Sequence, residues 1–423
     1  MLAAGFACQF LLTRLLTLPE YAIYVFAVAW IRTLGVPAVL GLERLIVREV
    51  AALKAVGNWP EWRGLVRWSQ HSALAASVAI AVVTAATAWL VFPEQSWSPT
   101  LILAAWLLPL LTVTRVQQFI VQGMGHPILS QLAEALVLPT VFAAALIGWY
   151  LLTGHLSVRR VMLMNVIATA TALATATVIL TRLLPDAVRR VRPAPQAARW
   201  SRSLAPLLLT TGAASITAQI PTLMLGLLDG RARDLALFAI ARSLSDLALI
   251  PVLALIPIWS PLVAALWRRG ERHAVQVTAT IWARRIAWLY LPVFAVLMIF
   301  AEPILRIFGP PFAGAETALR ILSVGYLVNL LAGWNGIVLV TAGHEREVAV
   351  VSLACAALCG ALCALLIPSA ALTGAAIAAA VTMAVTNIAL AGLCHIRLGI
   401  MPTVFASVGT EQPADKGVAG QQA

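Results

Sequence analysis

Three arginines lie deep inside long apolar stretches of this chain, together with two acidic residues. The arginines are Arg32, Arg115 and Arg242, and the acids are Glu134 and Asp246. An arginine at the centre of a bilayer costs about 2.5–3.5 kcal/mol on insertion scales, so it needs a polar partner or a water-filled cavity. Because the planar guanidinium group matches phosphate and carboxylate, a chamber with this charge balance would suit an anionic, phosphate-bearing solute.

Uncharged polar residues accompany these charges at steps of three or four residues, the spacing of one helix face. We expect three residues near Arg115 to join the arginines in binding a solute, namely Thr112, Gln118 and Gln122. Glu134 and Asp246 would pair with the arginines or take part in coupling. Other polar residues would line the cavity or join helices, and these are Thr211, Ser215, Gln219 and Asn329.

Each of these features also has a purely structural interpretation, and the sequence leaves both open. Arg242 and Asp246 have the spacing of a helix-stabilising ion pair. Glu134 could pair with Arg115 only to hold the fold. Serine and threonine stripes often bond one helix to the next. Arg32 could extend its side chain to the membrane surface.

No catalytic or metal-binding pattern occurs in the sequence. The six histidines are scattered, no cluster has the spacing of metal ligands, and there is no phosphate-binding glycine loop. The five cysteines lie in apolar runs and read as small core residues rather than a disulfide framework. We therefore expect no enzymatic activity, no metal and no cofactor.

The composition identifies the class of protein. Of 423 residues, 61% are hydrophobic and 11% are charged, whereas a soluble domain has about 25% charged residues. Too little charge is present to cover a water-soluble globule, which indicates a polytopic membrane protein. The net charge of +12 fits basic membrane loops better than a nucleic-acid partner.

The apolar stretches are long and continuous, so they predict an all-α fold of about twelve membrane-spanning helices. The expected spans are 1–18, 21–40, 72–92, 99–121, 129–152, 161–183, 205–228, 235–260, 286–308, 318–341, 348–368 and 371–396. With alternating spans, 19 basic residues fall on one side and 6 on the other. The richer side is expected to be cytoplasmic, with both termini there.

The two halves of the chain resemble each other. Glu20–Ala27 lies over Asp234–Ala241, and each half holds six of the expected spans. This predicts a parallel repeat of two pseudo-symmetric six-helix bundles around a central cavity. The expected units are an N-terminal bundle at 1–184, a basic cytoplasmic linker at 185–204, a C-terminal bundle at 205–397 and a polar, disordered tail at 398–423.

Several motifs resemble those of a known transporter family. The run Leu12–Tyr24 (LTRLLTLPEYAIY) is similar to the opening segment of polysaccharide flippases, and Gly41–Arg48 followed by Gly57 is similar to their second-loop signature. Thr341–Gly343 resembles a turn of the same family. The chain thus resembles the multidrug/oligosaccharidyl-lipid/polysaccharide (MOP) flippase superfamily, in its O-antigen and exopolysaccharide branch.

This resemblance implies a V-shaped pair of bundles in the bacterial cytoplasmic membrane that moves a lipid-linked oligosaccharide. The cargo would be linked through undecaprenyl pyrophosphate and would pass from the inner to the outer leaflet by alternating access, with Arg32 and Arg115 contacting pyrophosphate or acidic sugars. The bundles would rock about the Pro185–Pro206 linker. The implied partners are membrane lipids and the glycan polymerase and glycosyltransferases of the same pathway.

Two alternative functions remain open from the sequence. A cation-coupled multidrug or small-molecule exporter of the same superfamily should carry acidic cavity residues, whereas arginines outnumber acids inside these spans. A membrane-embedded polysaccharide polymerase or ligase would need a large outer loop. The longest outer connection, about 309–319, is too short for one.

Overall fold

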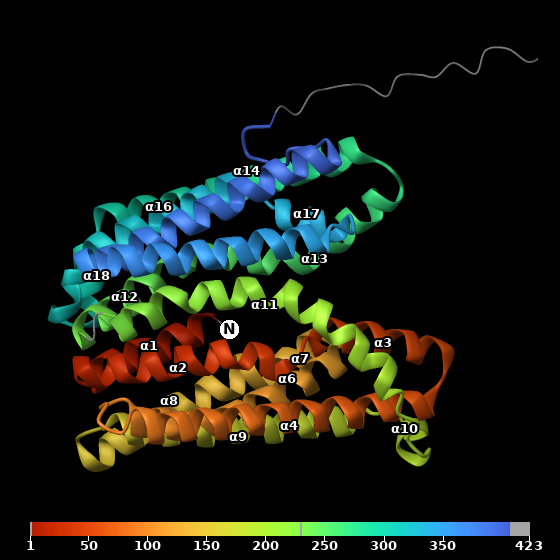
Figure 1. The fold of residues 1–423 in the computed structure, drawn as a ribbon, viewed down its shortest axis with the longest axis horizontal. Helices are drawn as coiled ribbons and strands as arrows, with labels where there is room; N and C mark the ends of the chain where they lie inside the picture. Colours follow the sequence, from red (N-terminus) through yellow and green to blue (C-terminus); the bar gives the residue numbers. More distant parts are fainter. Residues whose placement is uncertain (1, 229–230, 407–423) are drawn as a thin grey trace, which may run out of the picture.

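The computed structural model describes residues 2–228 and 231–406, and every element in these ranges is a helix (Figure 1). The first half contains α1 (Leu2–Leu15), α2 (Leu18–Val39), α3 (Leu42–Val56), α4 (Trp59–Val91), α5 (Ser98–Ala105), α6 (Leu107–Gly123), α7 (Pro127–Leu132), the π-helical turn η1 (Ala133–Val137), α8 (Leu138–Thr153), α9 (Val158–Leu183) and α10 (Asp186–Arg190).

The second half begins with the long helix α11. Its elements are α11 (Ala197–Leu228), α12 (Ala232–Ser245), the 3₁₀ turn η2 (Asp246–Leu249), α13 (Ile250–Arg268), α14 (Arg272–Ile299), α15 (Ala301–Phe308), the 3₁₀ turn η3 (Pro310–Ala315), α16 (Glu316–Ala332), α17 (Asn335–Thr341) and α18 (Glu345–Leu398). Each of the twelve predicted spans falls on helix within the described residues.

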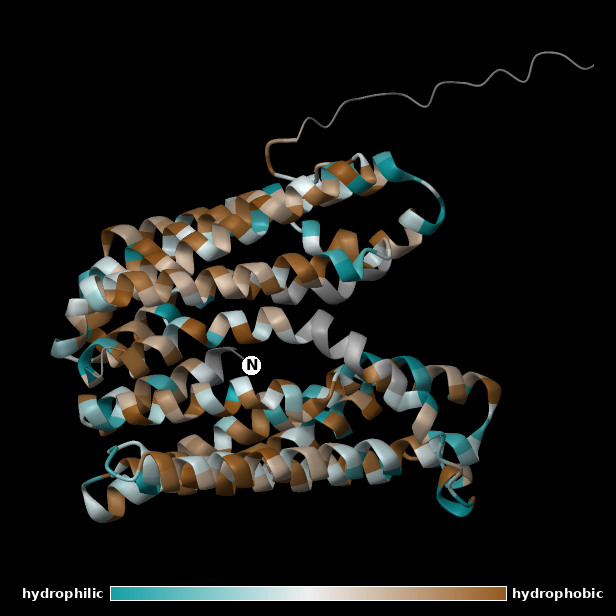
Figure 2. Cartoon of the chain, in the orientation of Figure 1, coloured by the Kyte–Doolittle hydropathy of each residue, from teal (hydrophilic) through white to brown (hydrophobic). Residues whose placement is uncertain are grey.

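The protein is a multi-pass membrane protein. Among the described residues, eight helices are long and apolar enough to cross a bilayer, and the 54-residue α18 is two helices joined at a kink at Ala371 (φ 41°). Hydrophobic residues run along these helices, and hydrophilic residues gather at their ends (Figure 2). The predicted all-α membrane fold is confirmed.

The ends of the helices are fixed by local backbone and side-chain features. The backbone N–H of Thr17 donates to the Glu20 carboxylate (3.2 Å), which satisfies a free N–H at the start of α2. Leu40 and Gly41 adopt left-handed conformations (φ 56° and 72°), so the chain leaves α2 and turns directly into α3. This turn places Glu43 beside the cavity that Arg32 of α2 also lines.

The two halves share one core at one end of the molecule and have separate cores at the other. The largest apolar cluster mixes residues of α1 and α2 with residues of α12, α15, η3 and α18. A second cluster belongs to α3, α4 and α6, and a third to α13, α14 and α17. The ribbons accordingly converge at one end and diverge at the other (Figure 1). We refer to these as the closed end and the open end.

Aromatic contacts between the halves make up much of the closed end. Phe308 packs edge-on against Phe6 (5.5 Å between ring centroids) and Phe10 (5.8 Å), and Phe312 packs against Tyr21 (5.9 Å). Arg14, which could have extended to the membrane surface, instead donates to the carbonyl of Ile307 on the other half. These contacts hold α1 and α2 against α15 and η3.

The segment between the halves is docked on the N-terminal half. Arg199 contacts the carboxylates of Glu49 (3.3 Å) and Glu61 (3.2 Å), both of which are about nine-tenths buried. The N–H of Ala194 donates to Pro60 (3.0 Å). Helix α11 begins at Ala197, inside the range expected to be linker, because these contacts order the chain before the membrane span starts.

Two features differ from a simple set of straight spans. The predicted span 318–341 is divided into α16 and α17 at Gly333, whose φ of 83° and contact with Pro402 leave no room for a side chain. Within the expected tail, residues 399–406 pack on the second half, and Arg284 donates to the carbonyls of Val404 (2.9 Å) and Ala406 (2.8 Å). Residues 407–423 lie outside the described residues.

Candidate substrate cavity

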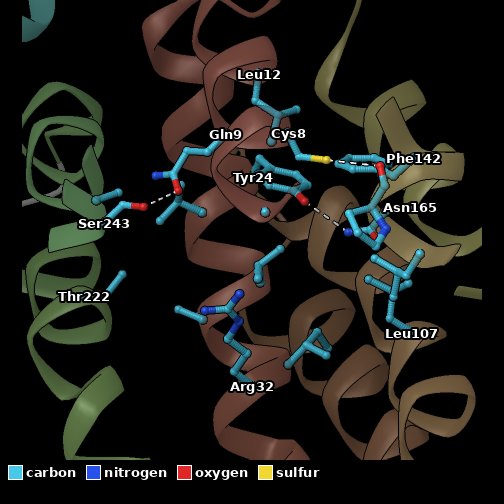
Figure 3. A pocket seen from close by; sticks show the side chains of 18 of the residues that line it. Cys8, Gln9, Leu12, Tyr24, Arg32, Leu107, Phe142, Asn165, Thr222 and Ser243 are labelled. Carbon is cyan, nitrogen blue, oxygen red and sulfur yellow. Dashed lines mark hydrogen bonds between the residues drawn. The ribbon is translucent and has the colours of Figure 1, made fainter. Parts of the chain in front are cut away.

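Two connected cavities lie between the halves. The larger has a volume of about 480 Å³ and is lined by residues of α1, α2, α6, α8, α9, α11 and α12. The smaller, about 350 Å³, leads past Gly41 and Glu43 toward the open end. Arg32, Arg115 and Gln219 line both, so the two volumes meet at these side chains. Figure 3 shows the larger cavity with Arg32 toward one end.

Arg32 is the cation at this junction. Its side chain is exposed, although it stands in the middle of the membrane-spanning helix α2. Within the part of the chain that the structure describes, Arg32 forms no hydrogen bond or ion pair, and its electrostatic neighbours are Tyr24, Arg115, Arg242 and Asp246. A guanidinium in this position has all its donors available to a ligand.

Arg115 faces an acidic residue held on an irregular helix. Its guanidinium lies 3.5 Å from the carboxylate of Glu134, and both side chains are partly exposed to the cavity (35% and 24%). Glu134 belongs to the π-helical turn η1, which interrupts the span formed by α7 and α8. Single π turns inside helices occur frequently at functional sites. The wider turn directs the carboxylate into the cavity.

Arg242 and Asp246 form a comparable pair in the second half. The two side chains are 4.0 Å apart, and Arg242 also donates to the carbonyl of Ala218 on α11. Asp246 opens the 3₁₀ turn η2 and accepts a hydrogen bond from Tyr326 of α16. Glu134 and Asp246 therefore both stand where regular α-helix is interrupted, one in each half.

The charges of the cavity leave one cation uncompensated. Arg115 and Arg242 each have a carboxylate neighbour, whereas Arg32 has none at ion-pairing distance among the described residues. At the open end, Glu43 adds a further acid, and burial raises the pKa of this carboxyl. When Glu43 is protonated the cavity has a net positive charge, which is the condition for attracting an anion.

The remaining predicted residues are placed differently. Gln219 lines both cavities, and Ser215 lines the smaller one. Thr112 (1% exposed) and Gln118 (4%) are buried between helices and line neither cavity. Gln122 is exposed at the end of α6, and Asn329 is partly buried on α16. The side chain of Thr211 lies outside the described residues.

Several cavity residues were not singled out from the sequence. Gln9, Tyr24, Asn165 and Ser243 line the larger cavity and Glu43 the smaller one. Gln9 and Asn165 are isolated amides within apolar spans, and this isolation is the sequence feature that could have identified them as cavity residues. Within residues 2–228 and 231–406, no three His, Cys, Asp or Glu side chains gather closely enough to hold a metal ion.

Comparison with solved structures identifies the fold. A multidrug resistance MATE family transporter of the MOP superfamily, in its inward-facing conformation, matches 94% of this chain and 95% of its own with a TM-score of 0.79 and 16% identity. An outward-facing MATE family transporter of the same superfamily matches with a TM-score of 0.59 at 15% identity. This match covers 94% of this chain and 92% of that chain.

A third match is a MOP superfamily transporter from Pyrococcus furiosus Vc1. It covers 94% of this chain and 92% of its own at 16% identity, with a TM-score of 0.66, and the reverse polarity of its binding pocket is said to suggest a different function. No family model and no curated protein matches the sequence. The chain therefore has the fold of the transporters of the MOP superfamily.

Proposed function

We propose that this protein is a transporter that moves a lipid-linked oligosaccharide, joined through undecaprenyl pyrophosphate, from the inner to the outer leaflet of the bacterial cytoplasmic membrane. The observation that carries the proposal is the position of Arg32. It is exposed at the junction of two cavities, and it forms no ion pair among the described residues. A guanidinium left free in this way suits a pyrophosphate group.

The route into the cavity supports the same cargo. The smaller cavity leads toward the open end, where the basic residues of α3 and α10 and Arg268 at the end of α13 lie. If basic segments mark the cytoplasmic side, the cavity faces the side on which lipid-linked glycans are assembled. A cavity of about 480 Å³ accommodates a pyrophosphate and its adjoining sugars, with the lipid left in the bilayer.

The arrangement of the cores supports alternating access. At the closed end the halves meet through a shared apolar cluster, which includes the aromatic contacts of Phe308, and through single hydrogen bonds. A rocking motion that exchanged these for contacts between α3 and α17–α18 would expose the cavity on the other side. One such contact exists already, since Arg44 lies 3.4 Å from Glu345. The proposed partners are membrane lipids and the glycosyltransferases and polymerase that make and use the glycan.

The test is a leaflet-exchange assay with purified protein in liposomes. The probe is a fluorescent farnesyl-pyrophosphoryl-N-acetylglucosamine, and a membrane-impermeant quencher reports which leaflet holds it. We expect the wild type to exchange the probe, and we expect Arg32→Ala to exchange it about tenfold or more slowly, because one charge-assisted contact is lost. Exchange no faster than in protein-free liposomes contradicts the proposal.

A second candidate is a cation-coupled exporter of multidrug or other small molecules. Two observations favour it: the similarity to MATE transporters, and the presence of Glu134, Asp246 and Glu43 along the cavities. The same liposomes, loaded with ethidium and given an inward sodium or proton gradient, separate the two. Gradient-driven ethidium movement without leaflet exchange of the glycolipid probe supports the exporter.

A further inference from the structure

We propose that the inner part of the cavity is a separate, uncharged subsite that binds the sugar rings next to the pyrophosphate. We call it the roof subsite and define it as Gln9, Tyr24, Phe142, Asn165 and Ser243. The inference rests on the proposed function, which supplies the pyrophosphate, and adds the chemistry of the group attached to it. All five residues line the larger cavity, and all five are labelled in Figure 3.

The subsite combines flat apolar rings with hydrogen-bonding groups of both kinds. The rings of Tyr24 and Phe142 are nearly parallel (13°), with centroids 6.3 Å apart. Asn165 donates to the Tyr24 hydroxyl (3.1 Å), whose own proton has no acceptor among the described residues. A pyranose ring has an apolar C–H face and a rim of hydroxyls that both donate and accept. The Tyr24 ring, backed by Phe142, which is only 3% exposed, and bordered by amides and hydroxyls, complements both parts.

The roof subsite differs from the rest of the cavity in charge. Its five side chains are neutral, whereas Arg32, Arg115 and Arg242 with their two acids lie farther along. The α carbons of Tyr24 and Arg32 are two turns apart on α2, a rise of about 12 Å, and the guanidinium of Arg32 is an electrostatic neighbour of Tyr24, so a pyrophosphate bound by Arg32 lies next to the roof subsite. Phosphates would therefore lie by the arginines and the sugars toward the closed end. The cargo would be held with its glycan inward and its lipid toward the open end.

The position of Gln9 connects sugar binding to the contact between the halves. Gln9 lies on α1 and donates to the hydroxyl of Tyr21 (2.8 Å), and its amide oxygen accepts a hydrogen bond from Ser243 on α12 (2.5 Å). A sugar hydroxyl that bonds to Gln9 or Ser243 competes with this link between the halves. Occupation of the roof subsite would thus loosen the closed end when cargo is present.

The experiment compares two probes of equal charge. The sugar probe is farnesyl-pyrophosphoryl-N-acetylglucosamine, and the methyl probe carries a methyl ester in place of the sugar. Binding of each to full-length protein in nanodiscs is measured by calorimetry. We expect the wild type to bind the sugar probe about tenfold more tightly. Tyr24→Leu and Asn165→Leu should bring this ratio close to one, with little change for the methyl probe. Arg32→Ala should weaken both probes in parallel.

Control variants separate binding from folding. Thr171→Ala changes an exposed residue on the same helix as Asn165, so the ratio should not change. Tyr24→Phe keeps the ring and removes the hydroxyl, and it should retain part of the preference even if Tyr24→Leu does not fold.

The outcomes distinguish the two proposals. A ratio near one in the wild type, or an unchanged ratio in Tyr24→Phe and Asn165→Leu, overturns the roof subsite. If Arg32→Ala still weakens the methyl probe in that case, the proposed function stands. If the wild type binds neither probe, the proposed function fails and the roof subsite fails with it.

Discussion

Ser243 on α12 donates a 2.5 Å hydrogen bond to the amide oxygen of Gln9 on α1, and this bond joins the two halves beside the cavity. Ser243→Ala removes the donor and leaves the aromatic contacts of Phe308 in place. A neutral hydrogen bond contributes about 0.5–1.5 kcal/mol. We therefore expect the population of molecules with a separated closed end to rise about two- to tenfold.

Spin labels measure this change. Cysteines introduced at Glu94, in the turn after α4, and at Glu302, on α15, report the distance across the closed end. The native background is low because all five cysteines are buried and free. A longer-distance population should grow in Ser243→Ala. Identical distance distributions in the variant and the wild type would show that the bond does not hold the halves together.

Removing the negative charge beside Arg115 should strengthen anion binding. Glu134→Gln takes away the carboxylate that lies 3.5 Å from the guanidinium, so Arg115 becomes available and the cavity gains one positive charge. We expect the methyl probe to bind several-fold more tightly, with a steeper dependence on salt concentration. Weaker binding would mean that Glu134 positions Arg115 and that the pair, rather than free Arg115, forms the site. Glu94→Gln, outside the cavity, is the control.

Arg199 should stabilise the junction between the halves. It is the shared partner of Glu49 and Glu61, which are about nine-tenths buried, although Arg48 and Asn58 also contact them. Because these other partners remain, we expect Arg199→Ala to cost about 1–3 kcal/mol. The midpoint of thermal unfolding in detergent should fall.

Two variants test the cause of that loss. Arg190→Ala changes an exposed arginine on α10 and should leave the midpoint unchanged. Adding Glu49→Gln and Glu61→Gln to Arg199→Ala removes the charges that lost their partner, so stability should be partly recovered. A midpoint equal to that of wild type in Arg199→Ala would show that the ion pairs contribute nothing measurable, as is common for exposed pairs.

Hydropathy was sufficient to predict the helices, because each segment must bury its own backbone polar groups in lipid. It also located Arg32, Arg115, Arg242, Glu134 and Asp246, since charge in an apolar span is conspicuous. The sequence did not predict where the helices are interrupted by other kinds of turn. The π turn at Glu134 and the 3₁₀ turn at Asp246 depend on packing between helices, which periodicity does not record.

The polar stripe of α6 shows where pattern reasoning stops. Thr112, Arg115, Gln118 and Gln122 follow helical spacing, yet steps of three residues drift around the helix by about 60° each. Only Arg115 lines the cavity, while Gln118 is turned into the bundle and its amide nitrogen has no partner among the described residues. The sequence does not mark Tyr24 as a cavity residue, because a tyrosine in an apolar span has the same appearance as a buried core residue.

Glu43 should make anion binding depend on pH. It lies on the amphipathic helix α3, outside the membrane-spanning segments, and burial raises its pKa above the ordinary value of 4.5. A carboxyl whose pKa is higher in the folded protein stabilises the fold when protonated, and that contribution is lost as the pH rises through its folded pKa. Protonation also removes a negative charge from the cavity that contains Arg32 and Arg115.

The affinity for the sugar probe should therefore increase as the pH falls from neutral toward the ordinary carboxyl range. Both phosphates of this probe are diesters and keep their charge over that range, so the change reports on the protein. In Glu43→Gln the affinity should resemble that of the protonated wild type and vary less with pH, and the same substitution should flatten the pH dependence of thermal stability. Equal pH dependence in Glu43→Gln and the wild type would assign the titration to a group other than Glu43.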